Sequence, residues 1–235
     1  MIICHKYQFI FLKTRKTAGS SVEIALSRLC DENDIVTTIA EEELRQEEGG
    51  RAGKNIPKSW YQYSPKDIAK LFLPLPNRKP EKSLLHNHVS AKRVKRYVSS
   101  EIWNNYLKIT IERNPWDKAI SHYYWAKGAK ENYPSLSEHL RRLSEKHLHA
   151  LSNWKIYTIN NQIAVDRVLF YETLTKDLSE LANELGVEEL NLPKKKAKGS
   201  YRKDKRHYKE LLSESDVELI RKVCQREIDA FGYQF

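Results

Sequence analysis

The feature that most restricts how this chain can fold is an alternation of short apolar runs with amphipathic stretches. Residues 7–13 (YQFIFLK) are apolar and aromatic, as in a buried strand, and residues 20–29 then carry apolar side chains at helical spacing. The alternation occurs three times, in the pairs 7–13 and 20–29, 107–112 and 116–127, and 165–171 and 173–185. Strand, loop and helix in this order predict an α/β fold with a central parallel sheet flanked by helices.

Further helices are predicted outside these pairs. Residues 89–99 form a basic amphipathic helix, and residues 213–231 a final helix with one apolar face. Residues 31–82 contain several prolines and less regular patterning, so we interpret them as a variable insertion with a short helix at 64–71. Such an insertion shapes a substrate cleft or is only a surface loop. We expect residues 1–235 to form a single domain.

Charge and cysteine content narrow the class of protein. The net charge of +10 favours an anionic partner: a nucleotide, an acidic polysaccharide, a nucleic acid or a membrane surface. The three cysteines show no metal-binding spacing, and so few of them suggest a reducing compartment. The apolar start is too short and too polar for a signal peptide or a membrane span. We therefore expect a soluble, cytoplasmic protein without a transmembrane segment.

The loop between the first predicted strand and helix has the chemistry of an anion site. Residues 12–23 (LKTRKTAGSSVE) combine a lysine with small residues and hydroxyls before a helix N-terminus. Small residues let a ligand approach the backbone, and helix amides, lysine and hydroxyls bind anions. The nucleoside-triphosphatase pattern GxxxxGK[ST] is absent. Taken alone, the segment could equally be a capped helix start, with Ser20 or Ser21 as the cap.

A second segment offers another anion contact. Arg113 ends the predicted strand 107–112, and Ser121 lies eight residues further on, in the next helix. An arginine at a strand end suits bidentate phosphate recognition, and the serine hydroxyl could share the same phosphate. The alternative is that Arg113 pairs with a nearby carboxylate.

Together the two segments resemble the sulfotransferase family, and most closely its branch acting on carbohydrates of the chondroitin and heparan type. The family loop K-T-A/G-x-S/T matches Lys16-Thr17-Ala18-Gly19-Ser20-Ser21. The family segment R-x-P-x-x-K/R-x-x-S-x-Y matches Arg113, Pro115, Lys118, Ser121 and Tyr123. Weaker similarities lie at residues 170–174 and in the C-terminal stretch. Arg15 stands where many members have proline, and residues 31–82 match nothing in the pattern.

The resemblance implies a P-loop-like sulfotransferase fold and 3'-phosphoadenosine-5'-phosphosulfate (PAPS) as sulfuryl donor, with adenosine 3',5'-bisphosphate as product. Lys16 would bridge the sulfuryl group and the leaving phosphate, and Arg113 with Ser121 would hold the 3'-phosphate. A late nucleotide contact is expected in residues 198–205, best at Arg202, although this basic segment could be only a solvated loop. The implied donor-binding residues are Arg15, Lys16, Thr17, Ala18, Gly19, Ser20, Ser21, Arg113, Ser121 and Arg202.

The acceptor hydroxyl needs a general base, and histidine is the commonest one. His86 and His88 lie between the two nucleotide segments, and His88 begins a stretch resembling the H-x-x-A of the carbohydrate branch. We therefore predict His88 as the base and Lys16 as the second catalytic residue. No third ligand accompanies the two histidines, so no metal is predicted. The expected acceptor is a hydroxyl group, by resemblance that of a glycan.

Three other functions compete with this prediction. An atypical nucleotide kinase would need a Mg²⁺-binding carboxylate at a strand end. A nucleic-acid-binding module would fit the charge and the aromatic content, but no recognised motif accompanies them, so no nucleic-acid partner is expected. A sulfotransferase fold without catalysis would fit if His88 were not the base.

Overall fold

The computed structural model describes residues 1–57, 84–147, 150–195, 204 and 206–235. Its centre is a five-stranded sheet with the strand order β3-β1-β2-β4-β7. The strands are β1 (Ile2–Cys4), β2 (Phe9–Leu12), β3 (Ile35–Val36), β4 (Leu107–Glu112) and β7 (Arg167–Phe170). β2, β4 and β7 run parallel, whereas β1 is antiparallel to both of its neighbours. The protein is thus a mixed α/β structure with a mostly parallel sheet and flanking helices.

The predicted parallel sheet needs one correction, because β1 joins it in the opposite direction. Only residues 5–8 connect β1 to β2, with Gln8 at φ 50°. A connection this short forms a hairpin and cannot return the chain to the start of a parallel strand. The apolar run before His5 is also a strand that the sequence analysis did not predict, because His5 and Lys6 interrupt it so early.

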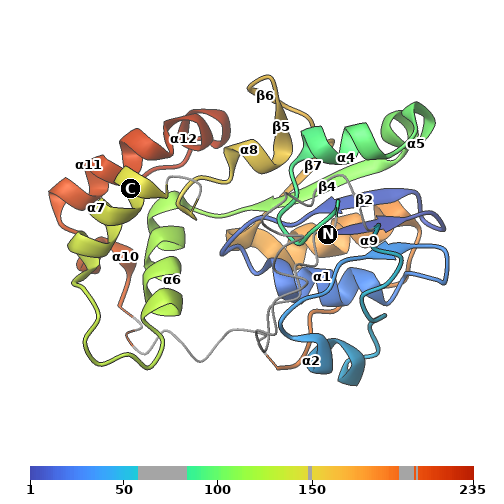
Figure 1. Cartoon of the computed structure of the whole chain (residues 1–235), viewed down its shortest axis with the longest axis horizontal. Helices are drawn as coiled ribbons and strands as arrows, with labels where there is room; N and C mark the ends of the chain where they lie inside the picture. The colour runs from blue at the N-terminus through green and yellow to red at the C-terminus, as the bar shows by residue number, and fades with distance from the viewer. Residues whose placement is uncertain (58–83, 148–149, 196–203, 205) are drawn as a thin grey trace, which may run out of the picture.

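Helices cover both faces of the sheet (Figure 1). On one face lie α1 (Gly19–Ser27) and α9 (Leu174–Leu185), and on the other lie α4 (Ala91–Tyr97), α5 (Ser100–Asn105) and α8 (Trp154–Tyr157). Neighbouring strand residues point to opposite faces. Phe11 accordingly packs with Leu26 of α1 in one buried cluster, and Ile10 with Val94 of α4 in another.

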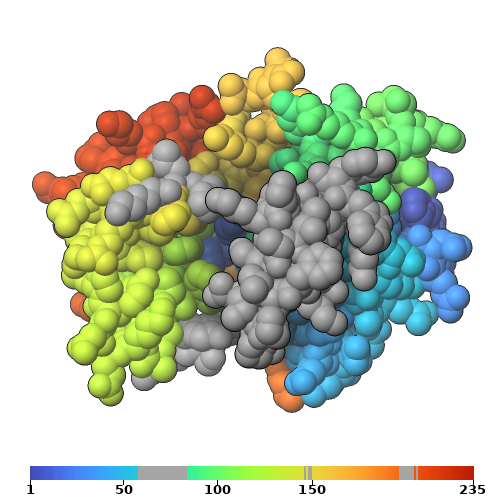
Figure 2. All heavy atoms as spheres, in the orientation of Figure 1, coloured from blue at the N-terminus to red at the C-terminus, as the bar shows by residue number. Residues whose placement is uncertain are grey.

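A third hydrophobic cluster lies beyond the carboxyl ends of the strands, in what we call the helical lobe. It consists of α6 (Pro115–Lys127), α7 (Leu136–Lys146), α10 (Tyr208–Leu211), α11 (Glu214–Val223) and α12 (Gln225–Phe231). Trp116 is its largest fully buried side chain, and its indole N–H donates to the Val217 carbonyl at 3.2 Å. In the space-filling view, α6, α7 and the segment between them form one continuous surface (Figure 2).

Several predicted helices are confirmed, with two corrections. α6 begins at Pro115, with Asn114 accepting hydrogen bonds from the backbone N–H groups of its first turn, and α9 ends at Gly186 in the left-handed conformation. The predicted helix 213–231 is two helices, because the backbone at Cys224 (φ −105°, ψ 21°) leaves the helical conformation. α1 starts one residue earlier than predicted, and its N-cap is Ala18 without a side-chain cap.

The remaining elements are short. They are α2 (Glu42–Glu47), β5 (Thr158–Ile159), β6 (Gln162–Ile163) and the 3-10 helix η3 (Tyr171–Thr173). The predicted helix 64–71 lies outside the described residues. Within the described part of the chain, none of the helices has the length and apolar character needed to cross a membrane.

Candidate active site

The carboxyl ends of β2, β4 and β7 lie side by side. Leu12 of β2 is in register with Thr110 of β4, and Glu112 with Phe170 of β7. The segments that follow the three strands therefore meet at one edge of the sheet. In open parallel sheets this edge is where ligands bind.

Arg113, the first residue after β4, contacts the segments that follow both neighbouring strands. Its Nη1 donates to the Lys16 carbonyl at 3.1 Å, and its guanidinium lies 3.8 Å from the centroid of the Tyr171 ring. Its Nε and Nη2 donate to the Asp117 carboxylate at 2.9 and 2.6 Å. The carboxylate pairing considered from the sequence is therefore present. These contacts use three of the five N–H donors of a guanidinium.

The loop of residues 13–18, which follows β2, has an unusual backbone. Lys16 and Ala18 are non-glycine residues in the left-handed region, with φ 62° and 63°. Such conformations cost about 1–3 kcal/mol each and concentrate at functional sites. The loop ends at Gly19, where an added Cβ would lie 2.9 Å from Cγ of Lys13. A glycine is therefore needed for the start of α1 to pack this closely on the end of β2.

Two threonines attach loop 13–18 to the sheet. The Thr14 hydroxyl donates to the Ile111 carbonyl of β4 and shares a 2.8 Å hydrogen bond with the Thr17 hydroxyl. Both threonines are buried. The Thr17 side chain thus points into the protein, so a ligand could reach only its backbone.

Asn153, just before α8, also holds loop 13–18. Its side-chain oxygen accepts from the Arg15 backbone N–H at 3.0 Å, and its amide nitrogen donates to the Arg15 carbonyl at 3.1 Å. Asn153 is 1% exposed, and its own backbone N–H donates to the buried Glu227 carboxylate at 2.9 Å. The second helix of the predicted 213–231 segment therefore supports the loop through Asn153.

A buried charge pair lies beneath the site. Glu112 ends β4, and its carboxylate accepts from Lys118 Nζ at 2.9 Å and from the Tyr157 hydroxyl at 3.0 Å. Burial lowers the pKa of Lys118, but the charge of Glu112, its hydrogen bond and the charges of other nearby groups together outweigh burial, so the net shift of the pKa is upward. Lys118, a position of the second sequence segment, therefore pairs inside the protein.

Lys13 is likewise turned into the protein. Its Nζ lies 2.8 Å from the Glu23 carboxylate of α1, which also lies 3.1 Å from Arg45. Burial raises the pKa of Glu23, but the surrounding cations outweigh it and lower the pKa to about 2. This leaves Arg15 and Lys16, both half-buried, as the loop cations with solvent access.

His88 is fixed to the same loop. Its Nδ1 lies 3.0 Å from the Lys13 carbonyl, and because a carbonyl can only accept, Nδ1 is the donor and Nε2 keeps its lone pair. Burial lowers the pKa of His88 to about 3, and the charges of Lys13 and Arg15 act in the same direction. The imidazole is therefore neutral at pH 7. The pKa of His86 is also lowered, mainly by burial.

Comparison with known proteins agrees with this arrangement. The model of the Sulfotransferase family matches residues 1–234. The chain belongs to the sulfotransferase family. It is also similar to a protein of Archaeoglobus fulgidus described as an uncharacterized protein, with 28% identity over 100 residues, or 41% of this chain and 81% of that protein.

In this sulfotransferase most of the residues predicted from the sequence lie at the strand-end edge. Arg15 to Ala18 form the loop, Gly19 to Ser21 form the first turn of α1, and Arg113 follows β4. His88 contacts the loop, and Ser121 lies in α6, the helix that Arg113 precedes. Arg202 lies outside the described residues. The ligand roles of all these residues stay predictions.

The sequence analysis missed two features of the candidate site. Asn153 carries no local signal, because its partner Arg15 is 138 residues away. Trp125 of α6 was also passed over, yet Lys16 Nζ lies 5.2 Å from the centroid of its ring. Its position four residues after Ser121, on the same helix face, is the signal that could have identified it.

The cysteines also gather in a way that their spacing did not indicate. Cys4, Cys30 and Asp34 are buried, with possible ligand atoms within 4.8 Å of one another. The Asp34 carboxylate accepts from the backbone N–H groups of His5 and Asp31 at 2.6 and 2.8 Å. These bonds give Asp34 a structural role in joining β1 to the segment before β3.

Proposed function

We propose that this sulfotransferase moves a sulfuryl group from PAPS to a hydroxyl of a carbohydrate acceptor. The observation that carries the proposal is the contact between Arg113 and the Lys16 carbonyl, because it joins the two anion-binding segments at adjacent strand ends. PAPS carries a phosphosulfate and a separate 3'-phosphate, so two linked anion sites suit it. The fold would then use its first loop in the manner of a phosphate loop.

The donor would be held by residues of both segments. Loop 13–18 and the first turn of α1 supply backbone N–H groups, the Lys16 ammonium and the hydroxyls of Ser20 and Ser21 for the phosphosulfate. Arg113 and Ser121 take the 3'-phosphate. Asp117 orients the Arg113 guanidinium. Two of the five guanidinium N–H donors lie outside the contacts described above, which is enough for a bidentate contact with a phosphate.

The reaction is an in-line displacement. The acceptor oxygen attacks sulfur, a new oxygen–sulfur bond forms, and the bond between sulfur and the phosphate oxygen breaks. The acceptor proton passes to Nε2 of His88, and adenosine 3',5'-bisphosphate leaves with the electron pair. Lys16 stabilises the negative charge that develops on the leaving phosphate.

Phosphoryl transfer is the less favoured chemistry. A kinase would need a carboxylate at a strand end to bind Mg²⁺. Glu112 is paired with Lys118, and Glu172 accepts the Asn114 backbone N–H at 2.7 Å. Because both carboxylates already have partners, and because the chain belongs to the sulfotransferase family, sulfuryl transfer is favoured over phosphoryl transfer.

The first test is a calorimetric titration with adenosine 3',5'-bisphosphate, with 5'-AMP as the ligand control. We expect micromolar binding that requires the 3'-phosphate. Arg113→Ala should weaken the binding of the bisphosphate by about 10- to 100-fold, because the variant lacks charge-assisted hydrogen bonds worth about 1.5–3 kcal/mol. Lys16→Ala should lower the transfer rate more than the affinity.

Arg142→Ala serves as the matched control, because it removes an exposed arginine on α7, outside the proposed site. Equal binding of the bisphosphate and 5'-AMP by the wild-type protein would contradict the proposal. So would an Arg113→Ala variant that behaves like Arg142→Ala.

A further inference from the structure

Two cysteines and an aspartate meet inside the protein. Cys4 is the last residue of β1, Cys30 follows α1, and Asp34 directly precedes β3. All three are buried, and their possible ligand atoms, the two sulfurs and a carboxylate oxygen, lie within 4.8 Å of one another. Thiolates and carboxylates are both zinc ligands in proteins, so this cluster has the composition of a metal site.

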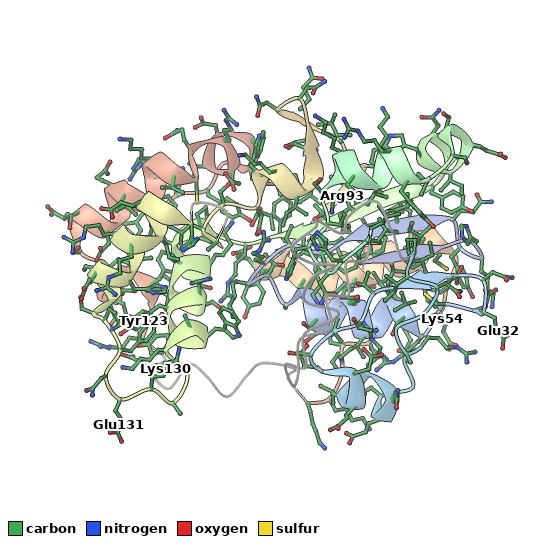
Figure 3. The ribbon with its side chains drawn as sticks, in the orientation of Figure 1. Glu32, Lys54, Arg93, Tyr123, Lys130 and Glu131 are labelled. Atoms are coloured by element: carbon green, nitrogen blue, oxygen red, sulfur yellow. The ribbon has the colours of Figure 1, made fainter. Side chains whose placement is uncertain are left out.

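The cluster lies at the other end of the sheet from the candidate active site. Cys4 is in register with Phe9, the first residue of β2, whereas the candidate site follows the last residue of that strand. Figure 3 shows Glu32 and Lys54, from the segments around the cluster, at the end of the molecule away from Tyr123 of α6. A role for the cluster is therefore separate from donor binding and does not rest on the proposed function.

The fold brings the three side chains together from different segments. β1 and β3 pair antiparallel, with Ile3 opposite Ile35. The next pair in this register is Cys4 and Asp34, and directly opposed residues of an antiparallel pair share one face. Cys30, after α1, belongs to the same buried cluster as Cys4. The two strands and the end of the helix thus supply one side chain each.

Backbone hydrogen bonds orient the Asp34 carboxylate. One of its oxygens accepts from the His5 backbone N–H at 2.6 Å, and the other accepts from the Asp31 backbone N–H at 2.8 Å. A carboxylate offers about four lone-pair sites, and these two bonds use two of them. Hydrogen bonds to a ligand of this kind are the outer contacts that hold metal ligands in position.

Residues 51–55 fix the backbone around the cluster. Arg51 Nε donates to the Cys30 carbonyl at 3.1 Å. Asn55 Nδ2 donates to the carbonyls of Glu32 and Asp34 at 2.7 and 2.9 Å. None of these bonds uses a sulfur or carboxylate atom of the cluster. The positions of the ligands are therefore set by the fold itself, as in a preformed site.

The donor atoms favour zinc over the other common cations. Sulfur is a soft ligand, whereas Mg²⁺ and Ca²⁺ take oxygen ligands. A tetrahedral zinc ion, with bonds of about 2.3 Å to sulfur and about 2.0 Å to oxygen, holds its donor atoms about 3.5–3.8 Å apart. The atoms of the cluster lie within 4.8 Å of one another, so small side-chain rotations are enough to reach this separation.

We propose that Cys4, Cys30 and Asp34 bind a zinc ion that joins β1, the end of α1 and β3. Both thiols bind as thiolates and release their protons to the solvent, and a water molecule completes the four ligands. The ion contributes to stability and takes no part in sulfuryl transfer. The site departs from the sequence prediction of no metal, which rested on the spacing of ligands along the chain.

A disulfide is the alternative use of two neighbouring cysteines. It would join Cys4 to Cys30 but would not use the Asp34 carboxylate. It would also require an oxidising compartment, whereas three cysteines in 235 residues favour a reducing one. Zinc is therefore the better match to all three side chains.

The first test is a titration of the reduced, metal-free whole chain with Co²⁺, a spectroscopic probe for zinc sites. Bonds between Co²⁺ and thiolates give a charge-transfer band, which Zn²⁺ should abolish at about one equivalent per chain. Cys224→Ser is the control, because Cys4 and Cys30 are then the remaining cysteines of the chain. Cys224 lies in the helical lobe, where its Sγ donates to the Leu151 carbonyl at 3.7 Å. We expect the same band in the wild-type protein and in Cys224→Ser.

Two variants measure the contribution of single ligands. Cys30→Ser should reduce the charge-transfer band to about half, whereas Asp34→Asn should keep the band. Both should weaken Zn²⁺ binding, measured by competition with a chelator, by at least the 10- to 100-fold that loss of an outer contact typically costs. The spectra of the wild-type protein and of Cys224→Ser decide the question even where these variants do not fold.

Three results would overturn the site. The first is a wild-type spectrum without the charge-transfer band, including one from a chain in which Cys4 and Cys30 re-form a disulfide. The second is a band that disappears in Cys224→Ser. The third is a denaturant midpoint that Zn²⁺ raises as much for Asp34→Asn as for the wild-type protein, because the ion would then bind elsewhere.

Discussion

At the scale of single residues, His88 is held in one orientation and one tautomer. The bond from Nδ1 to the Lys13 carbonyl fixes the orientation of the ring and leaves the lone pair on Nε2. Burial and two nearby cations keep the imidazole neutral. A bound phosphosulfate would bring negative charge beside Lys16 and oppose those cations, which would raise the His88 pKa toward the range useful for a general base.

The same contacts predict how His88 affects stability as the pH changes. The pKa of His88 is about 3 in the folded protein and about 6.5 in the unfolded chain. As the pH falls from 6.5 toward 3, the unfolded chain binds a proton that the folded protein does not, so folding stability falls. Denaturant unfolding at pH 7 and pH 5 should therefore show that the free energy of unfolding falls less between the two pH values for His88→Gln than for the wild-type protein.

His86→Gln is the matched control, because the His86 side chain is more exposed than that of His88 while its pKa is lowered in the same direction. Its effect on the pH dependence should be smaller than that of His88→Gln. Direct titration by nuclear magnetic resonance should find His88 unprotonated at pH 5. A His88 resonance that titrates near pH 6.5 would refute the assigned environment.

Among structural elements, loop 13–18 depends most on its neighbours. Its left-handed residues Lys16 and Ala18 are unfavourable in isolation, so surrounding contacts must hold them in place. Arg113 holds the Lys16 carbonyl, and Asn153 holds both backbone groups of Arg15. The backbone conformation of the loop is therefore maintained by residues from other segments.

Asn153→Ala should destabilise the protein and weaken donor binding together. It leaves the Arg15 backbone N–H and carbonyl without their partner, at a cost of about 1–3 kcal/mol, and removes a support of the strained loop. We expect a lower denaturant midpoint and a roughly tenfold weaker affinity for adenosine 3',5'-bisphosphate, by about 1.4 kcal/mol. Unfolding curves and calorimetry measure the two effects.

Ser152→Ala is the neighbouring control for Asn153. Its hydroxyl donates to Glu227 at 2.6 Å, so the variant disturbs the same support without removing the contacts to Arg15. It should lower stability but leave bisphosphate affinity within about twofold of wild type. If both variants weaken bisphosphate binding equally, the hydrogen bonds between Asn153 and Arg15 do not determine the shape of the site.

Whether an element could be predicted depends on whether its sequence signals lie within or next to it. β4 and α6 were predicted at or within one residue of their observed bounds, because a strand-like run, a capping asparagine and Pro115 are local signals. β1 was missed because three residues are too few to show a period. The break at Cys224 was missed because the apolar spacing continues across it.

For the whole molecule, the site depends on the meeting of the sheet and the helical lobe. The first segment follows β2 of the sheet, whereas Arg113 precedes α6 of the lobe. Asn114, between β4 and α6, donates through its side-chain amide to the Tyr208 hydroxyl of α10 at 3.3 Å. No periodicity encodes such long-range contacts, so the sequence could indicate the two segments proposed to bind anions but not the residues that hold them together.

The net charge of +10 is also a property of the whole molecule, and salt separates its effect from that of the site. The attraction of a basic protein for any polyanion acts over the Debye length, which shrinks from about 10 Å at 0.1 M salt to about 3 Å at 1 M. Recognition of a 3'-phosphate by Arg113 acts at contact distance and is screened less.

Raising NaCl from about 0.05 to about 0.5 M should therefore weaken the binding of the bisphosphate and of 5'-AMP alike. The ratio of their two dissociation constants, measured by calorimetry at each salt concentration, should change by less than about threefold. A ratio that falls to one at high salt would mean that the protein senses only total charge, as a polyanion-binding module would.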